Sequence, residues 1–289
     1  MGNPKVSVIV ITHNEAPYIS NCLKSVLNQS YENFEIIIVD EHSSDGTLDI
    51  VKSFKSRKIR LALSSSKNIC VARNIGIKQA RGEFVFFIDG DCIASRNWII
   101  AAMKNFKDDV IGIEGKTYYV SKNFRPSLRD KIIYNLKGGL YATCNIAYKK
   151  KTLKEIGGFD EKFKFAGDID LGLRAKKLGK IFFEDKMVVF HQRKLLSTRD
   201  FFVDQEKLKS GIIIIKKHYE SGFYRVGRIV YPASFLMLFP AFVIIYLILS
   251  RRRLEKLSDL LFLPLYFIQP YFIRAVVWKT AVEEKIFLI

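Results

Sequence analysis

Two aspartates stand one residue apart in the segment FVFFIDGDCIAS, directly after a run of apolar residues. Asp89 and Asp91 flank Gly90, which lets the backbone turn so that both carboxylates converge. Carboxylate oxygens in this arrangement suit Mn²⁺ or Mg²⁺, and a bound ion would offset the repulsion between two partly desolvated charges. The alternative is an ordinary Asp-Gly turn, because Asp-x-Asp occurs often by chance.

A second acidic pair and a histidine follow later in the chain. Asp168 and Asp170 lie in KFAGDIDLGLRAKKLG, and His191 ends the apolar run VVFH. A carboxylate here could act as a general base that takes a proton from a hydroxyl group. Near a helix start it could equally be a residue that the helix dipole stabilises. His191 is either structural or a further metal ligand.

Polar residues also follow other predicted elements. Asp40 closes the run IIIVD, where its carboxylate could accept hydrogen bonds from a base or ribose, or act as a turn or helix cap, a role that Ser43 and Ser44 could already supply. Arg73 and Asn74, in VARNIG, could reach a diphosphate or belong to a solvated helix face.

Apolar runs and helical spacings alternate through the first half of the chain. The expected strands are residues 6–11, 35–39, 59–63 and 84–88, and the expected helices are residues 16–29, 47–54, 71–80 and 168–178. Buried strands that alternate with helices predict a parallel sheet covered on both faces. Ligands bind beyond the carboxyl ends of such strands. Residues 12–15, Asp40 and the pair Asp89 and Asp91 all fall at that edge.

The composition allows one large domain, alone or with an appendage. The chain has 289 residues, of which 49% are hydrophobic, and a formal net charge of +18. Such a basic protein is expected to meet nucleic acid, a phosphorylated substrate or an anionic membrane surface. The four cysteines form no CxxC pair, which favours a reducing compartment. The N-terminal segment enters a strand directly, so the main domain is expected in the cytosol.

The last third of the chain is different in character. Residues 229–249 contain no charge, and at about 1.5 Å per residue they are long enough to cross a bilayer. Residues 260–278 form a second apolar stretch, interrupted by two prolines and an arginine, and three arginines (251–253) lie between the two. The segments span the membrane, form a re-entrant or interfacial hairpin, or include a buried core helix. The sequence leaves these alternatives open.

Six blocks of sequence, in order and at suitable spacing, resemble the family 2 glycosyltransferases with the GT-A fold. The blocks are VSVIVITHNE, CLKSVLNQSY, FEIIIVDEHSSDGT, ARNIGIKQARGEFVFFIDGDC, IGGFDE and DIDLGLRAKKLG. They extend over roughly residues 5 to 192. The resemblance implies a Rossmann-like α/β fold, a mixed and mainly parallel sheet flanked by helices, here followed by C-terminal hydrophobic helices.

The same resemblance implies an inverting, metal-dependent transfer of a sugar from a nucleotide diphosphate donor, with UDP favoured. It assigns Asp89 and Asp91 to Mn²⁺ or Mg²⁺ and Asp168 to the general base, and His191 joins them as a candidate metal ligand. The residues expected to bind the donor are Thr12, Asn14, Glu15, Asp40, Arg73 and Asp89.

The chain departs from the usual family pattern at several positions. Ile11 stands where Pro is common, His13 where Tyr is common, and Glu41 at a second acidic position. Gly167 replaces the Glu that normally precedes the base, which leaves the choice between Asp168 and Asp170 less secure. A QxxRW-type motif is not found in the sequence, which argues against a processive polysaccharide synthase.

We therefore expect a glycosyltransferase domain over residues 1–225, with a helical extension after about 192, and a membrane-associated segment over 226–289. The expected acceptor is a membrane-proximal glycan or lipid-linked molecule, with the catalytic domain cytoplasmic and no nucleic acid bound. The alternatives are a nucleotidyltransferase on a similar sheet, or an inactive scaffold that binds membrane or nucleic acid.

Overall fold

The computed structural model describes residues 5–196, 205–218, 225–226, 229–230, 240–249, 256–283 and 287–288. The chain divides into two compact units. The first comprises Met1–Lys122 and Ile133–Gln192, and the second comprises Asn123–Ile132 and Arg193–Ile289. The domain boundary between residues 225 and 226, which the sequence predicts, stays a prediction.

The first unit is built on one mixed sheet of eight strands in the order β3-β2-β1-β4-β7-β6-β8-β5. The strands are β1 (Val6–Thr12), β2 (Phe34–Asp40), β3 (Ile59–Leu63), β4 (Phe84–Asp89), β5 (Cys92–Ala94), β6 (Val110–Tyr119), β7 (Ile146–Lys149) and β8 (Lys180–His191). Strands β1 to β4 run parallel, as do β6 and β8, whereas β7 and β5 pair antiparallel with their neighbours. The predicted α/β class, with a mostly parallel sheet, is confirmed.

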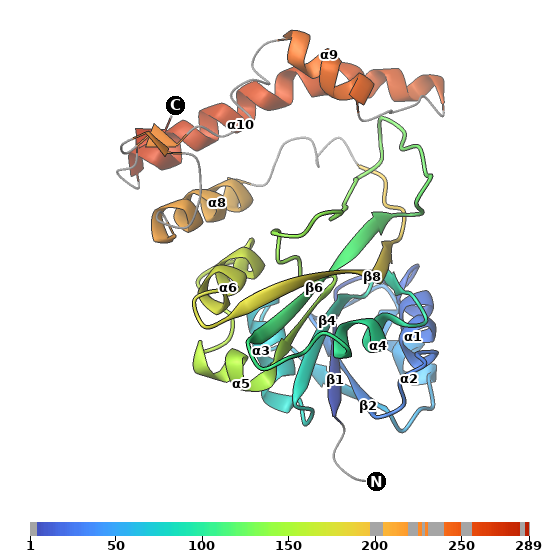
Figure 1. Cartoon of the computed structure of the whole chain (residues 1–289). Helices are drawn as coiled ribbons and strands as arrows, with labels where there is room; N and C mark the ends of the chain where they lie inside the picture. Colours follow the sequence, from blue (N-terminus) through green and yellow to red (C-terminus); the bar gives the residue numbers. More distant parts are fainter. Residues whose placement is uncertain are drawn as a thin grey trace. The chain divides into compact units, whose positions relative to one another are not determined.

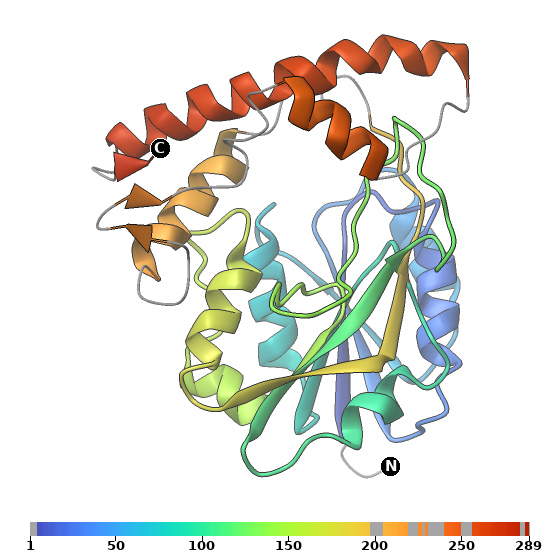
Figure 2. The same cartoon turned by 45° about the horizontal axis from the view of Figure 1, so that its top comes forward.

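Helices cover both faces of this sheet (Figures 1 and 2). They are α1 (Ile19–Leu27), α2 (Thr47–Ser53), α3 (Ile69–Gln79), α4 (Trp98–Met103), α5 (Lys150–Glu155) and α6 (Gly167–Ala175). Helices α1, α2 and α4 lie on one face and α3, α5 and α6 on the other. Every residue of β1 is buried, because its alternate side chains enter the two cores.

The β-branched residues of the first strand show how the two cores are divided. Val8 and Val10 join the core beneath α1, whereas Ile9 points to α3, where a Cβ added at Gly76 would come within 2.6 Å of the Ile9 Cγ2 atom. The glycine therefore lets α3 approach the strand closely. The expected strands and helices of residues 6–88 all exist, with ends shifted by a few residues.

The second unit contains α8 (Gln205–Lys217), α9 (Pro240–Leu249), the 3₁₀ helix η2 (Leu257–Phe262), α10 (Leu263–Glu283) and the short strands β9 (Arg225–Val226), β10 (Ile229–Val230) and β11 (Phe287–Leu288). Helix α10 packs against α8 and α9. The small core of the second unit contains Leu128, Val243, Phe262 and Tyr266. The Tyr266 hydroxyl donates to the Leu128 carbonyl at 2.6 Å.

The apolar segments of the last third can now be assigned in part. Residues 240–249 of the first apolar segment are helical and residues 229–230 are in a strand, while residues 231–239 and the three arginines lie outside the described residues. In the described part of the chain, one helix, Leu257–Thr280, has the length and apolar composition to cross a membrane. A core helix of a soluble protein passes the same test.

The close approach of α3 to β1 predicts that Gly76→Ala lowers the free energy of unfolding by about 1–3 kcal/mol, because the added methyl group overpacks the core. Chemical denaturation measures the change. The matched control is Gly211→Ala in α8, where an added Cβ has no atom within 4 Å. This control should be neutral or stabilising by up to about 1 kcal/mol, and an equal loss in both variants would contradict the packing argument.

Candidate active site

The acidic turn lies where β4 ends and β5 begins. The register pairs Ile11 of β1 with Asp89 of β4, and Thr12 with Asp40 of β2, so these polar residues share the carboxyl edge of the sheet, as the sequence predicts. The Gly90 amide donates to the Ile11 carbonyl at 3.0 Å. This bond fixes the turn that directs the chain from Asp89 to Asp91.

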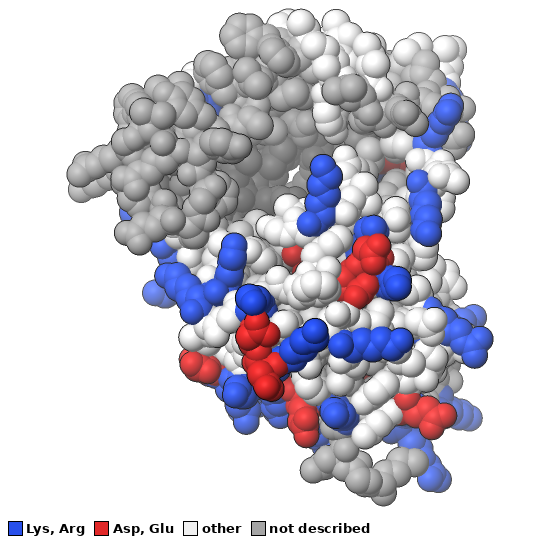
Figure 3. Space-filling model, viewed as in Figure 1, with Lys and Arg blue, Asp and Glu red and all other residues white. Residues whose placement is uncertain are grey.

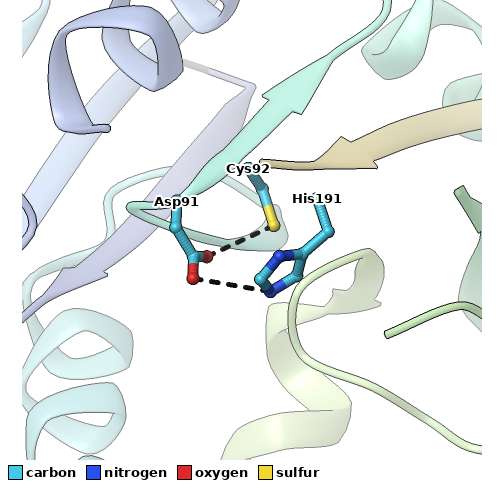
Figure 4. A group of neighbouring side chains, drawn as sticks. All are labelled: Asp91, Cys92 and His191. Carbon is cyan, nitrogen blue, oxygen red and sulfur yellow. Dashed lines mark hydrogen bonds and ion pairs between the residues drawn. The ribbon is translucent and has the colours of Figure 1, made fainter. Parts of the chain in front are cut away.

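Strand β5 then brings His191 to Asp91. Cys92 pairs with His191 across the antiparallel ladder, and the Gln192 amide donates to the Asp91 carbonyl at 2.8 Å. As a result, the His191 Nε2 atom lies 3.4 Å from Asp91 Oδ2 (Figure 4). Both side chains are buried.

The second ring nitrogen of His191 decides which tautomer fits. Its Nδ1 atom lies 3.1 Å from the Gln192 carbonyl, an acceptor, so we assign the proton to Nδ1. The lone pair of Nε2 then faces the carboxylate of Asp91. A second ring proton or a divalent cation would relieve this arrangement, and oxygen and imidazole ligands suit a divalent metal such as Mn²⁺. The residues therefore fit the metal site that the sequence predicts.

Cys92 completes this buried cluster and is a residue that sequence reasoning missed. Its Sγ atom lies 3.6 Å from Asp91 Oδ1 (Figure 4). Burial raises the pKa of the Cys92 thiol well above its usual value, and neighbouring Cys144 raises it further. The group therefore remains a neutral thiol that donates to Asp91, and it is a poor metal ligand in this state.

Asp89 faces a buried guanidinium. Arg73 Nη2 lies 3.7 Å from Asp89 Oδ1, and the Asp89 side chain keeps 32% of its surface exposed. Burial of the carboxyl group raises the pKa of Asp89; Arg73 opposes this, and Asp91 adds to it. His191 also opposes the rise in pKa and Asp168 adds to it, while Asp89 stays partly accessible to a ligand.

The residues expected to bind the donor form a connected turn. Asp40 is fully buried and accepts from the Ser43 amide at 2.9 Å and the Ser43 hydroxyl at 2.5 Å. The Asn14 amide donates to the same hydroxyl at 2.9 Å, and the Glu15 amide donates to Thr47 Oγ1 at 2.8 Å. Asp40 therefore performs the turn-capping role that the sequence left as an alternative, and its role toward a donor stays a prediction.

Two buried oxygen atoms beside this turn have no hydrogen-bond partner in the described protein. They are Thr12 Oγ1 and Glu41 Oε1. Burial raises the pKa of Glu41, and the charges of His13 and Arg73 oppose the rise. Unpartnered buried polar atoms are costly, so these two oxygens are candidates for contacts with a bound ligand.

Helix α6 separates the roles of its two aspartates. Asp170 is fully buried and pairs with Arg174 at 2.8 Å, and that guanidinium also donates to the carbonyls of Ile156 and Gly158. Asp168 is only half-buried, and its charge contributes to the raised pKa of Asp89. Asp170 is therefore engaged in holding α6, which favours Asp168 as the residue that faces the site.

The unusual Gly167 has a steric explanation. A Cβ at this position would lie 2.4 Å from the Sγ atom of Cys70, a fully buried residue in the first turn of α3. The thiol occupies the space that a glutamate side chain would need. The glycine is thus matched to Cys70, and it leaves the position of Asp168 intact.

Asn74 is engaged in structure. Its side chain donates to the Phe159 carbonyl at 2.9 Å and to Glu161 Oε1 at 2.8 Å, and accepts from the Phe159 amide at 2.8 Å. Of the pair in VARNIG, only Arg73 faces the acidic turn, while Asn74 fixes the loop that precedes α6.

Glu114 is a second residue that sequence reasoning missed. Its buried carboxylate accepts hydrogen bonds from the Asn135 side chain and from the backbone amides of Gly139, Leu140 and Tyr141, at 2.6–3.0 Å. Tyr141 in turn packs on α6, since a Cβ at Gly172 would lie 2.2 Å from the ring. Glu114 therefore positions the loop that supports the helix of Asp168.

The structure thus brings Asp89, Asp91 and Arg73 together with His191, which the sequence left as either a structural residue or a metal ligand. The strand ends that carry Thr12 and Asp40 adjoin them, and Asn14 and Glu15 are held by the same turn. The chemical roles of these residues stay predictions.

A sequence model described as glycosyl transferase family 2 matches residues 7–165. The chain belongs to glycosyl transferase family 2. The match covers more than half of the chain and includes the strand ends, the acidic turn and the loop before α6. His191, and Asp168 in α6, lie beyond its limits.

Individual proteins are similar over different lengths. Glycosyltransferase AglE of Haloferax volcanii is 27% identical over 191 residues, which are 61% of this chain and 62% of AglE. The chain thus spans less than two thirds of that relative. The mannosyltransferase PcManGT from Pyrobaculum calidifontis, solved with GDP-Man and Mn²⁺, is 18% identical and superposes with a TM-score of 0.63 over 98% of this chain and 89% of that one. S. aureus TarS with UDP-GlcNAc gives 0.58 at 21% identity, over 97% and 91%. The two structures show the shared GT-A fold.

The geometry predicts that Mn²⁺ stabilises the protein through Asp91. At a concentration about 100 times the dissociation constant, the free energy of unfolding should rise by about 2.7 kcal/mol. The gain should be lost in Asp91→Asn and kept in the control Asp185→Asn, an exposed carboxylate on β8. Because burial raises the pKa of Asp89, protons compete with the ion and the gain should shrink as the pH falls. Equal stabilisation of both variants would contradict this site.

A second prediction concerns Glu114. Glu114→Gln places an amide against backbone N–H donors, so the free energy of unfolding should fall by about 2–3 kcal/mol. Turnover should also fall, because the loop no longer holds α6. The control is Glu184→Gln on β8, whose carboxylate accepts from the Asn105 side chain and from the Lys186 backbone amide. Unchanged stability in Glu114→Gln would show that the loop is held in another way.

Proposed function

We propose that the chain is an inverting, metal-dependent glycosyltransferase of class EC 2.4. The observation that carries the proposal is the buried pair of Asp91 and His191 beside Asp89 and Arg73, at the carboxyl edge of the sheet. Family membership makes sugar transfer the reaction that such a site serves. A bound divalent ion would neutralise charge on the departing diphosphate.

A nucleotide diphosphate sugar is the proposed donor. The unpartnered oxygens of Thr12 and Glu41 and the turn of Asn14, Glu15 and Asp40 offer hydrogen-bonding groups to a nucleoside. The relatives in solved structures hold GDP-Man with Mn²⁺ and UDP-GlcNAc, which supports the donor class. We propose UDP ahead of GDP, on the family resemblance alone.

The proposed reaction is one direct displacement. The acceptor hydroxyl gives its proton to Asp168, and its oxygen forms the new bond to the anomeric carbon. The bond from that carbon to the diphosphate oxygen breaks, and the electron pair leaves with the nucleoside diphosphate. Attack from the face opposite the leaving group inverts the configuration, and the guanidinium of Arg73 stabilises the leaving charge.

The proposed acceptor is a glycan or lipid-linked molecule at the cytoplasmic face of a membrane. The support is the apolar second unit together with the net charge of +18. Lys and Arg side chains are scattered among Asp and Glu over the face that Figure 3 shows, with no single basic stripe. Such a distribution favours attraction to an anionic surface over the groove of a nucleic acid.

Donor turnover tests this function. Detergent-purified protein with Mn²⁺ is given UDP-, GDP- and dTDP-sugars, with and without acceptor extract, and released nucleoside diphosphate is measured. Asp168→Asn should lower kcat by about 10²–10⁴-fold with little change in donor affinity. Asp170→Asn should instead lower stability, because it removes the partner of Arg174.

Several results would overturn the proposal. Pyrophosphate released from a nucleoside triphosphate would identify a nucleotidyltransferase instead. A failure to bind any nucleotide by calorimetry would favour an inactive scaffold. Full activity in Asp168→Asn would remove this residue from the role of base.

A further inference from the structure

Helix α10 exposes one continuous apolar stripe. In α10 the exposed residues up to Trp278 follow each other at spacings of four and three, which places them on one helix face. We call them the α10 stripe: Pro264, Ile268, Tyr271, Ala275, Trp278 and Val282. The stripe continues into η2 at Leu257, Leu260 and Leu261, of which Leu257 is 82% and Leu261 75% exposed.

The stripe carries no charge along this length. Among described residues between Leu257 and Trp278, the two charged side chains, Asp259 and Arg274, are buried. Exposed Lys256 precedes the stripe, and exposed Lys279 and Glu283 stand near its other end. Helix α9 adds a second apolar surface, with Ile244, Ile245 and Ile248 all exposed. An exposed apolar surface of this extent indicates a binding site for a lipid membrane or another protein.

The chemistry of the stripe favours lipid over a second copy of the chain. A coiled-coil seam would place branched aliphatic residues at both core positions and charges beside them. In α10, one of the two heptad core positions is occupied by Pro264, Tyr271 and Trp278, which are not branched aliphatic residues. Apolar rather than charged residues flank the stripe. Tyrosine and tryptophan with lysines at the ends are instead typical of helices at the boundary between headgroups and acyl chains.

The packing of α10 argues for an orientation parallel to the membrane plane. The opposite face of α10 contacts α8, whose last turn carries Lys216 and Lys217. If α10 crossed the bilayer, it would draw the cations of α8 toward the hydrocarbon at high cost. Lying in the plane, α10 buries its stripe and leaves α8 in water.

We propose that the second unit binds an anionic phospholipid bilayer in its plane, through the α10 stripe and the exposed face of α9. The lysines at both ends of the stripe contact the headgroups, and the aromatic side chains enter the boundary layer. This surface would hold the enzyme beside a lipid-linked acceptor. The inference rests on the proposed membrane-proximal acceptor for its purpose, whereas the binding itself needs no turnover.

Vesicle flotation of the full chain tests the binding. The protein should float with equimolar phosphatidylcholine and phosphatidylglycerol, and bind about tenfold or more weakly to phosphatidylcholine alone. Ile268→Glu should weaken binding at least about tenfold. The control Leu178→Glu, at a leucine of the first unit that is 44% exposed, should bind as the unchanged protein does. No flotation, or equal binding of both variants, would overturn the proposal.

Tryptophan depth distinguishes the in-plane helix from a spanning one. The chain has two tryptophans; Trp98 is fully buried and Trp278 is 47% exposed. Quenching by lipids brominated near the headgroup or near the chain end is compared for Trp278 and for Tyr271→Trp in a Trp278→Phe background. Equal shallow depths support the in-plane arrangement, and a deeper position 271 than 278 would overturn it in favour of a spanning helix.

Two further measurements separate this inference from other outcomes. A lipid-free dimer that Ile268→Glu dissociates, seen by sedimentation, would overturn it in favour of a second copy. Donor hydrolysis in solution should be equal in Ile268→Glu and the unchanged protein. If neither protein hydrolyses the donor but only the unchanged protein floats with vesicles, the membrane-binding inference is supported and the transferase proposal fails.

Discussion

The antiparallel pairing of β5 with β8 is the constraint on which the rest of the site depends. It places Cys92 opposite His191, and so sets the imidazole of His191 against the carboxylate of Asp91 at the edge of an apolar sheet. A carboxylate facing a lone pair, with a second carboxylate next to it, is stable only if positive charge arrives. Arg73 supplies one charge to Asp89. The remaining imbalance is what makes the site receptive to a divalent cation and an anionic donor.

Three other buried acidic groups of the first unit are satisfied by the protein itself. Glu114 holds a loop, Asp170 holds Arg174, and Asp40 holds Ser43. Each lies where a backbone segment would otherwise be poorly fixed, and each costs little because its oxygens are hydrogen-bonded. Carboxylates whose oxygens are hydrogen-bonded within the protein therefore stabilise the fold, while the more exposed carboxylates of Asp89 and Asp168 are free to contact a substrate or ion.

Departures from the family pattern are accommodated locally. Gly167 leaves space for the Cys70 thiol, so the loss of the usual glutamate is matched by a neighbour on α3. Solved relatives at 18–21% identity share the fold, because buried strands specify a sheet mainly through apolar pattern and turn residues.

The sequence by itself determined the strands of residues 6–88, the carboxyl edge and the acidic turn, because continuous apolar runs and glycine turns are local properties. It also grouped Asp89 with Arg73, through the family's ordered blocks. Only the tertiary structure decided that His191 faces Asp91, that Asp170 is engaged by Arg174, and that Glu114 holds the loop under α6. These contacts join residues far apart in the chain, so no local pattern records them. The same holds for α10, since its apolar residues are spread around the helix and packing against α8 and α9 decides which of them remain exposed.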